Sequence, residues 1–437
     1  MTNGRREGAA AADAGEPGAR AGDVLEVSIE RVVPGGAGMA HARGLTVFVP
    51  LAAVGDVLRV RVERVKGRVA FASLTEIVTP GRGRVEPPCP YFGRCGGCDF
   101  QQLNYEAQLA AKVEIIRDCL RRIARLDAPA EIPITPSPVA WRYRSRARWQ
   151  HDPRNNHFGY YELASHRVVD VAECPVVVPE LQDTLARLRA SVVEHATDAE
   201  AAREFEAVAG DDGVSLDPPL AEGDARERTR EIAGERYRFD ASCFFQINHA
   251  LLDALVREAL RDADDSAAGG GRARSAVDLY CGVGLFTVPL ARRFERVTGV
   301  EANAAATAYA RRNLSDAGLS NARVETAPVG AWLARRAHKL APLDLLLLDP
   351  PRTGAEHGAI KGVLNLQPRR IVYVSCDPAT LARDLRELTA GGYTLDSVAA
   401  FDMFPQTHHV ETVARLTRAR RYENTEVNEN VRIHIKD

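Results

Sequence analysis

The stretch Val277-Asp278-Leu279-Tyr280-Cys281-Gly282-Val283-Gly284 joins an apolar run to a glycine turn, and a helical pattern follows it. Two glycines so close together let the backbone approach a ligand, and doubly wound α/β sheets bind nucleotides at such turns. Glu301 stands 17 residues after Gly284, at the end of the next apolar run. An acid there can accept hydrogen bonds from both ribose hydroxyls. We therefore expect a nucleotide-like ligand at one edge of a parallel sheet.

Apolar runs alternate with helical stretches from about Ser242 onward, which is typical of such a sheet. The expected strands are Ala276–Leu279, Val297–Val300, Leu343–Leu348 and Ile371–Val374. Thr287 stands where a dinucleotide-binding turn would have its third glycine. The turn therefore favours S-adenosylmethionine over a dinucleotide or a purely structural turn.

Two of these strands end in side chains that can react, Asp349 in Asp-Pro-Pro-Arg and Cys376 in Ser-Cys-Asp-Pro. A thiolate suits methylation of carbon 5 of uracil, because its attack on carbon 6 makes carbon 5 nucleophilic. A general base must then remove the proton of carbon 5, and Glu411 is the candidate. The alternatives are an inert buried cysteine and a solvated glutamate.

Neighbouring methyl-transfer chemistries would leave other residues in the segment from Asp349 to Arg352. An enzyme that methylates amino groups would have an aromatic residue where Arg352 stands, and a two-cysteine cytosine enzyme would have a second cysteine in this segment. Neither is present, so uridine is the better substrate.

A group of cysteines indicates a metal centre, because three of them lie within ten residues in a glycine-rich stretch. The candidate ligands are Cys89, Cys95, Cys98 and Cys174. A four-iron cluster is favoured over zinc, since a gap of five residues is longer than in zinc knuckles. The other cysteines are expected to pack in the core or the turn: Cys119, Cys243 and Cys281.

Two segments are candidates for binding RNA, although the net charge of −2 gives no global signal. Residues 23–80 alternate apolar and polar positions in about five short runs, which predicts a small β-barrel, and Arg59 to Arg68 are rich in cations. The run from Trp141 to Trp149 is expected to place four arginines on one face of a strand, where they can follow phosphates: Arg142, Arg144, Arg146 and Arg148.

The length of 437 residues predicts two or three domains. No apolar run approaches the roughly 20 residues that span a membrane, and residues 1–22 lack the apolar core of a secretion signal. We expect a cytoplasmic protein with a disordered tail at 1–22 and a polar tail at 422–437.

Taken together, these patterns resemble the RNA (uracil-5-)methyltransferase family, which includes iron–sulfur ribosomal RNA enzymes and a transfer-RNA enzyme. The resemblance covers about residues 23–420 and rests on the motifs above together with Phe244-Phe245-Gln246-Ile247-Asn248 and His409-Val410-Glu411-Thr412. It implies an α/β fold: an OB-like TRAM barrel at 23–80, a β-rich central iron–sulfur domain at 81–241 and a Rossmann-like class I methyltransferase domain at 242–421. The helix expected at 101–126 is implied to pack on the methyltransferase domain.

The resemblance also implies roles for single residues. Cys376 becomes the nucleophile and Glu411 the base, and the contacts to S-adenosylmethionine become Gln246, Tyr280, Glu301 and Asp349. The cysteine group becomes a [4Fe-4S] site, which favours ribosomal over transfer RNA as the partner. No protein partner is predicted. An RNA-binding or chaperone protein without catalysis is the alternative from another class.

Overall fold

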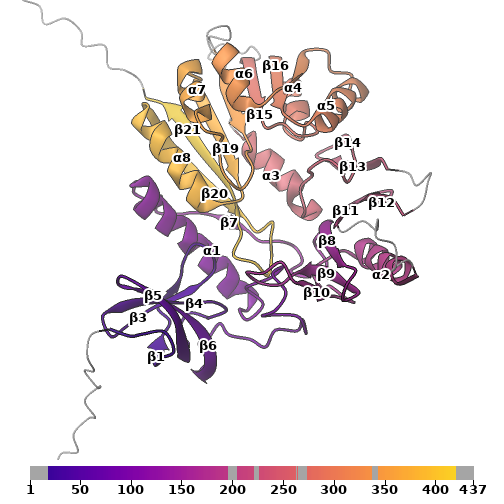
Figure 1. Cartoon of the computed structure of the whole chain (residues 1–437). Helices are drawn as coiled ribbons and strands as arrows, with labels where there is room; N and C mark the ends of the chain where they lie inside the picture. Colours follow the sequence, from indigo (N-terminus) through magenta and orange to yellow (C-terminus); the bar gives the residue numbers. More distant parts are fainter. Residues whose placement is uncertain are drawn as a thin grey trace, which may run out of the picture.

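The computed structural model describes residues 18–194, 204–220, 226–261, 263, 273–336 and 343–419 (Figure 1). Most of the two expected tails, residues 1–17 and 420–437, lies outside this part of the chain. None of the described helices is both long and apolar enough to cross a membrane.

Six strands form an N-terminal sheet in the order β1-β5-β6-β4-β3-β2. Alternating positions bury a core that includes Leu25, Val27, Leu58 and Val60, as the sequence pattern predicts. Within the described residues no pairing of β1 with β2 closes this sheet into a barrel. The strands are β1 (Val24–Ser28), β2 (Arg31–Val32), β3 (Gly38–Ala42), β4 (Leu45–Val49), β5 (Val57–Lys66) and β6 (Val69–Thr79).

The middle of the chain forms a five-stranded sheet in the order β10-β9-β8-β11-β12, and one face of it is covered by α2 (Pro179–Glu194). Leu181, Leu185 and Leu188 of α2 pack on Trp149 and Phe205. A separate hairpin, β13 (Arg228–Ile232) and β14 (Glu235–Phe239), follows. The sheet strands are β8 (Arg146–Asp152), β9 (His157–Tyr161), β10 (Val168–Asp170), β11 (Glu204–Gly210) and β12 (Gly213–Asp217).

The C-terminal part is an eight-stranded sheet in the order β17-β16-β15-β18-β19-β21-β20-β7. The strands from β17 to β19 are parallel, whereas β21 is antiparallel to both of its neighbours. All four strands predicted from the sequence are confirmed. The strands are β7 (Ile134–Thr135), β15 (Ala273–Leu279), β16 (Phe294–Glu301), β17 (Ala322–Thr326), β18 (Leu345–Leu348), β19 (Arg370–Ser375), β20 (Tyr393–Phe401) and β21 (Glu411–Arg418).

Helices cover both faces of this sheet and give two apolar cores. One core lies under α3 (Leu252–Ala259), α4 (Thr287–Arg293) and α5 (Ala304–Asp316). The other core lies under α6 (Val329–Arg336), α7 (Ala359–Leu366) and α8 (Pro378–Ala390). This arrangement leaves the ends of the parallel strands as the accessible edge of the sheet.

An early helix, α1 (Tyr105–Cys119), belongs to the second of these cores, although almost 300 residues separate it from the end of the sheet. Asn104 caps its N-terminus by accepting a hydrogen bond from the Ala107 N–H, and it continues into a π-helical turn at Leu120–Ala124. Figure 1 shows α1 between the N-terminal sheet and the C-terminal part. The helix therefore holds these two parts together.

Candidate active site

The sequence-predicted site residues of the C-terminal sheet meet at one edge, because parallel strands end on the same side. Tyr280, Asp349 and Cys376 directly follow β15, β18 and β19, and Glu301 is the last residue of β16. Glu411 comes to the same edge from the opposite chain direction, since it is the first residue of the antiparallel strand β21.

Cys376 and Glu411 are brought opposite each other by the pairing of β19 with β21. Ser375 is the register partner of Thr412, and the Thr412 hydroxyl donates to the Ser375 carbonyl over 2.9 Å. Cys376 and Glu411 are the next residues beyond this pair, and the charge of Glu411 raises the pKa of the Cys376 thiol, so the two side chains lie close together. Glu411 is only 1% exposed, and its Oε1 has no hydrogen-bond partner among the described residues. A buried carboxylate therefore faces the thiol with one oxygen free.

The charged groups around Cys376 shift the pKa of its thiol in opposite directions. Burial raises the pKa of the Cys376 thiol, and the carboxyls of Glu411 and Asp349 raise it further. Arg352 lowers this pKa through its positive charge and a hydrogen bond to the thiol. Burial likewise raises the pKa of Glu411, as does Asp349, while Arg352 lowers it. Arg352 is therefore the group that favours the charged forms of both side chains.

Asp349 lies beside an amide from a segment about 100 residues earlier. The Gln246 amide Nε2 donates to Asp349 Oδ2 over 3.3 Å, and the Gln246 side chain is buried. Burial raises the pKa of Asp349 to about 7, although the hydrogen bond from Gln246 lowers it. The pair offers one carboxyl and one amide to a ligand at this edge.

The glycine turn after β15 is held by carboxylates. Glu301 Oε2 accepts a hydrogen bond from the Gly282 N–H over 3.2 Å, and Oε1 accepts one from the Asn303 N–H over 2.7 Å. Tyr280 adopts a left-handed φ of 61°, and its hydroxyl accepts a hydrogen bond from the Glu356 N–H over 3.1 Å. These contacts fix the shape of the turn at the end of β15.

Thr287, at the position of the missing third glycine, has a structural role beneath the turn. Its hydroxyl donates to Asp278 Oδ2 over 2.5 Å, and Asp278 is fully buried. Burial raises the pKa of Asp278 to about 8, and the nearby carboxyls of Asp349 and Glu301 raise it as well. The hydroxyl thus satisfies a buried acid that a glycine would leave without this partner.

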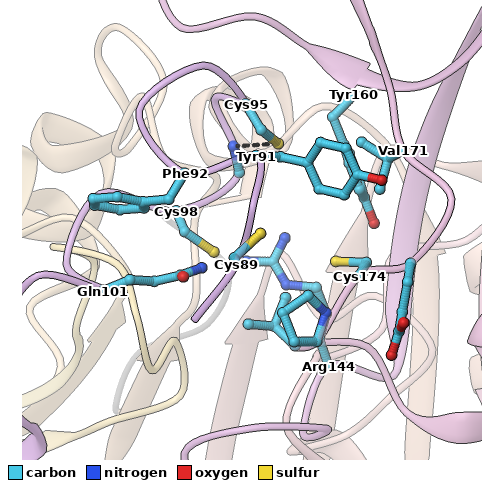
Figure 2. Close-up of a pocket in the computed structure, with 14 residues that line it drawn as sticks. Cys89, Tyr91, Phe92, Cys95, Cys98, Gln101, Arg144, Tyr160, Val171 and Cys174 are labelled. Atoms are coloured by element: carbon cyan, nitrogen blue, oxygen red, sulfur yellow. Dashed lines mark hydrogen bonds between the residues drawn. The ribbon is translucent and has the colours of Figure 1, made fainter. Parts of the chain in front are cut away.

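The four cysteines of the predicted metal centre line one pocket (Figure 2), namely Cys89, Cys95, Cys98 and Cys174. Burial raises the pKa of Cys95 to about 11 and that of Cys98 to about 12; the other thiols raise both further, and Arg144 lowers them. Within the described part of the chain, no group of three or more His, Cys, Asp and Glu side chains is placed to hold a metal ion. Cys119, Cys243 and Cys281 are buried elsewhere, as expected.

The predicted strand through the four arginines is only partly present. Arg142 has a left-handed φ of 52°, and β8 begins only at Arg146, although the four arginines still alternate with buried side chains. Arg144 lines the cysteine pocket. Arg146 and Arg148 form ion pairs with Glu206 of the neighbouring strand β11, and Arg146 also donates to two backbone carbonyls. Arg146 and Arg148 therefore link two strands of the central sheet, and binding of RNA by the four arginines stays a prediction.

The loop at 402–410, which carries no motif that predicts its role, connects the cysteine pocket to Glu411. The backbone N–H groups of Asp99 and Phe100 both donate to the Gln406 carbonyl, over 3.1 and 3.0 Å. The Asp99 carboxylate in turn binds the backbone N–H and the ring of His408. Burial and neighbouring cations lower the pKa of His409 to about 2, so that ring is neutral. The feature of the sequence that could have indicated this loop is the pair of histidines, His408 and His409, just before Glu411.

The chain is similar to known RNA-modifying enzymes over most of its length. The family model described as tRNA (Uracil-5-)-methyltransferase matches residues 225–419, and the TRAM domain model matches residues 19–75. A 23S rRNA (uracil(1939)-C(5))-methyltransferase of Vibrio parahaemolyticus is 32% identical, over 89% of this chain and 94% of that protein. One of Methylococcus capsulatus is 33% identical, over 90% and 97%.

A solved structure is similar throughout. It is the tRNA (uracil-54, C5)-methyltransferase of Pyrococcus abyssi in complex with S-adenosyl-L-homocysteine, with a TM-score of 0.67 and 27% identity, over 90% of this chain and all of that one. The extent of these matches, together with the geometry of the sheet edge, shows that the chain belongs to the S-adenosylmethionine-dependent RNA (uracil-5-)methyltransferases.

Proposed function

We propose that this enzyme forms 5-methyluridine in ribosomal RNA through a covalent adduct between Cys376 and uracil. The observation that carries the proposal is the register of β19 and β21, which sets a thiol opposite a buried carboxyl at the ligand-binding edge. The relatives named for 23S rRNA and the cysteine pocket favour ribosomal RNA, while the solved tRNA enzyme keeps transfer RNA as the second candidate. A ribosomal RNA substrate implies a cytoplasmic location.

The residues at the sheet edge fit S-adenosylmethionine. The carboxylate of Glu301 would accept the ribose hydroxyls, Tyr280 would pack beside the glycine turn, and Asp349 with Gln246 would face the polar end of the ligand. When bound there, the cofactor supplies an electrophilic methyl group, which carbon 5 of the uracil takes. We propose that this site belongs to a catalytic domain at 242–421, preceded by domains at 23–80 and 81–241.

In the proposed reaction, the Cys376 thiolate attacks carbon 6 of uracil and forms a carbon–sulfur bond, and the electron pair of the carbon 5–carbon 6 double bond moves toward carbon 5 and the carbonyl. After methylation, Glu411 takes the proton from carbon 5. The double bond re-forms and the bond from carbon 6 to sulfur breaks, so the thiolate is regenerated. Arg352 supports both steps because it favours the charged thiol and the charged carboxylate.

The two catalytic roles are separable by experiment. We expect Cys376→Ala to lower transfer of labelled methyl groups to unmodified ribosomal RNA by roughly 10⁴-fold or more. Glu411→Gln should instead accumulate an RNA–protein adduct that survives denaturing electrophoresis, because the adduct is methylated but not released. Calorimetry with S-adenosylmethionine serves as the control, since both variants should bind it like the wild type. Full turnover by Cys376→Ala would exclude the nucleophile, and absence of an adduct with Glu411→Gln would exclude the base.

We further propose that the cysteine pocket holds a four-iron cluster. Such a cluster binds one thiolate at each iron, so it needs four sulfurs spread around a common space and not gathered on one ion. The four cysteines that line one pocket support this proposal, and so does Arg144 in the same lining, whose Nε lacks a hydrogen-bond partner among the described residues. Anaerobic purification followed by visible absorbance and assays of iron and zinc decides the metal: bound zinc without iron would refute the cluster.

A further inference from the structure

The outer face of the N-terminal sheet carries a cluster of aromatic and cationic side chains that the catalytic site does not use. Phe48 of β4 and Phe71 of β6 are register partners on adjacent strands, with ring centroids 5.9 Å apart. On the other side of Phe71, the Arg64 guanidinium lies 4.5 Å from the ring centroid. Phe71 is 37% exposed, which is unusual for so large an apolar side chain.

A β-bulge places Arg64 in this cluster. The register of β5 and β6 shifts between Val62 and Arg64, so that Arg64 pairs with Phe71 while Arg61 pairs with Ser73. Without the shift, strict alternation would put position 63, which is a glutamate, opposite the ring. The bulge therefore places the cation Arg64, and not the acid Glu63, opposite Phe71.

The cluster borders a hollow. Phe48 and Phe71 line it together with seven other residues: Val33, Pro34, Ala37, Pro50, Glu63, Ala72 and Ser73. Glu63 is the charged side chain in this lining, while Arg61, Arg64, Lys66 and Arg68 of the same part of the chain are all exposed, and Arg64 lies over the Phe71 ring. Aromatic rings beside exposed cations match the chemistry of a single-stranded nucleic acid, whose bases stack and whose phosphates are anionic.

The hollow is continuous with the loop that leads to the catalytic edge. The turn that forms its wall includes Gly36, where an added Cβ would lie 3.0 Å from both Asp99 Oδ2 and His408 Cβ. His408 stands three residues before Glu411. The turn beside the hollow therefore packs against the loop that ends at Glu411.

We infer that Phe71 and Phe48 form a stacking site for an unpaired base of the RNA substrate, next to the target uridine, with Arg64 and Arg61 binding the adjoining phosphates. The inference rests on the proposed RNA substrate and assigns this part of the sheet a role in selecting it. A protein partner would be the other kind of occupant, but exposed cations beside the aromatic rings favour a base over an apolar side chain.

The test measures binding of a protein-free transcript of the large-subunit ribosomal RNA. Phe71→Ala should weaken binding roughly 5- to 150-fold, the range found for loss of one base–aromatic stack. Phe71→Trp should restore binding, because the larger ring still stacks. The matched control is Val24→Ala, another exposed apolar side chain of the same sheet, which should bind like the wild type. Thermal unfolding and calorimetry with S-adenosylmethionine show whether the variants are folded.

Each outcome has one meaning. Unchanged affinity of folded Phe71→Ala, with wild-type enzyme that binds and methylates the transcript, overturns the stacking site alone. Equal weakening by Phe71→Ala and Val24→Ala also overturns it, since the effect would not be specific to the ring. A defect seen on assembled ribosomal particles but not on the naked transcript assigns the surface to a protein and overturns it as well. Failure of the wild-type enzyme to methylate the transcript or intact ribosomal RNA counts against the proposed function instead.

Discussion

At the scale of the residue, the active site depends on one cation placed among three acidic groups. Burial raises the pKa of Cys376, Glu411 and Asp349; the carboxyls of Glu411 and Asp349 raise that of Cys376 further, and Asp349 raises that of Glu411. Arg352 acts in the opposite direction on both Cys376 and Glu411. Its guanidinium also lies 5.8 Å from the Phe404 ring centroid, in the loop before Glu411. Arg352 is therefore placed to set the pH range of the reaction.

Two substitutions should shift the pH dependence of Cys376 in opposite directions. Arg352→Met removes a positive charge, so the pKa of the thiol rises and its alkylation by iodoacetamide moves to higher pH. Glu411→Gln removes a negative charge, so the pKa falls and alkylation moves to lower pH. The measurement is the alkylation rate of Cys376 against pH, followed by mass spectrometry of the peptide. Shifts of the same sign in both variants would contradict the charge balance.

Arg352→Lys is the matched variant for this experiment. It keeps the positive charge but loses the planar fork of donors, so the alkylation profile should lie between those of the wild type and Arg352→Met. Methyl transfer should follow the same order at neutral pH. A lysine variant that behaves like methionine would show that the hydrogen bond to the thiol matters more than the charge.

At the scale of the element, a buried ion pair ties helix α1 to the loop before Glu411. Lys112 of α1 donates to Asp402 and, over 3.0 Å, to the Phe404 carbonyl, and both charged side chains are fully buried. Burial lowers the pKa of Lys112, whereas Asp402 raises it. The amide of Gln108, one turn earlier on α1, donates over 3.0 Å to the side chain of Gln406 in the same loop.

Removal of one partner of this pair should be costly. Lys112→Met leaves Asp402 buried and unpaired, and we expect a loss of about 3–5 kcal/mol in the free energy of unfolding. The double variant Lys112→Met/Asp402→Leu should recover much of this loss, because no buried charge remains. Urea unfolding measures both.

An exposed ion pair provides the control. Arg59 and Glu76 of the N-terminal sheet pair with their side chains 45% and 54% exposed, and Arg59→Met should change the free energy of unfolding by less than about 1 kcal/mol. If Arg59→Met and Lys112→Met lowered the free energy of unfolding equally, burial of the ion pair would not determine how much its loss destabilises the protein.

The sequence predicted the elements with local signals and missed those that depend on distant partners. The strands around the glycine turn, Asp349 and Cys376 were readable because a buried parallel strand is an apolar run that ends in its functional residue. The run of four arginines does not form one continuous strand, because a left-handed Arg142 interrupts it, and Glu206, about 60 residues away, pairs with two of the arginines. Neither the ion pairs with Glu206 nor the backbone conformation of Arg142 can be predicted from the alternation of residues between Trp141 and Trp149.

At the scale of the whole molecule, the cysteine pocket and the catalytic edge are joined by a short path. Cys98 is followed by Asp99, which binds His408 through its carboxylate and Gln406 through its backbone N–H. The loop from 402 to 410 is thus held between α1 and the cysteine-bearing segment. This arrangement gives the proposed cluster a mechanical role in placing Glu411.

Loss of the cluster should loosen this loop. Cys98→Ser should lose iron and raise hydrogen exchange of residues 402–410, while the strands β15 and β16 keep their protection and S-adenosylmethionine still binds. The readout is hydrogen–deuterium exchange with mass spectrometry on anaerobically purified protein. Cys119→Ala is the control, because Cys119 is buried away from the pocket. Unchanged exchange at 402–410 after complete loss of iron would separate the cluster from the catalytic loop.

The position of β21 has a consequence for how the enzyme is made. This strand is inserted between β19 and β20, both of which leave the ribosome before it, and it begins with Glu411. A nascent chain that has emerged only as far as β20 thus contains Cys376 but has an unfilled position in its sheet, and it lacks Glu411. Completion of the sheet and arrival of Glu411 at its edge are therefore one event in the synthesis of the protein.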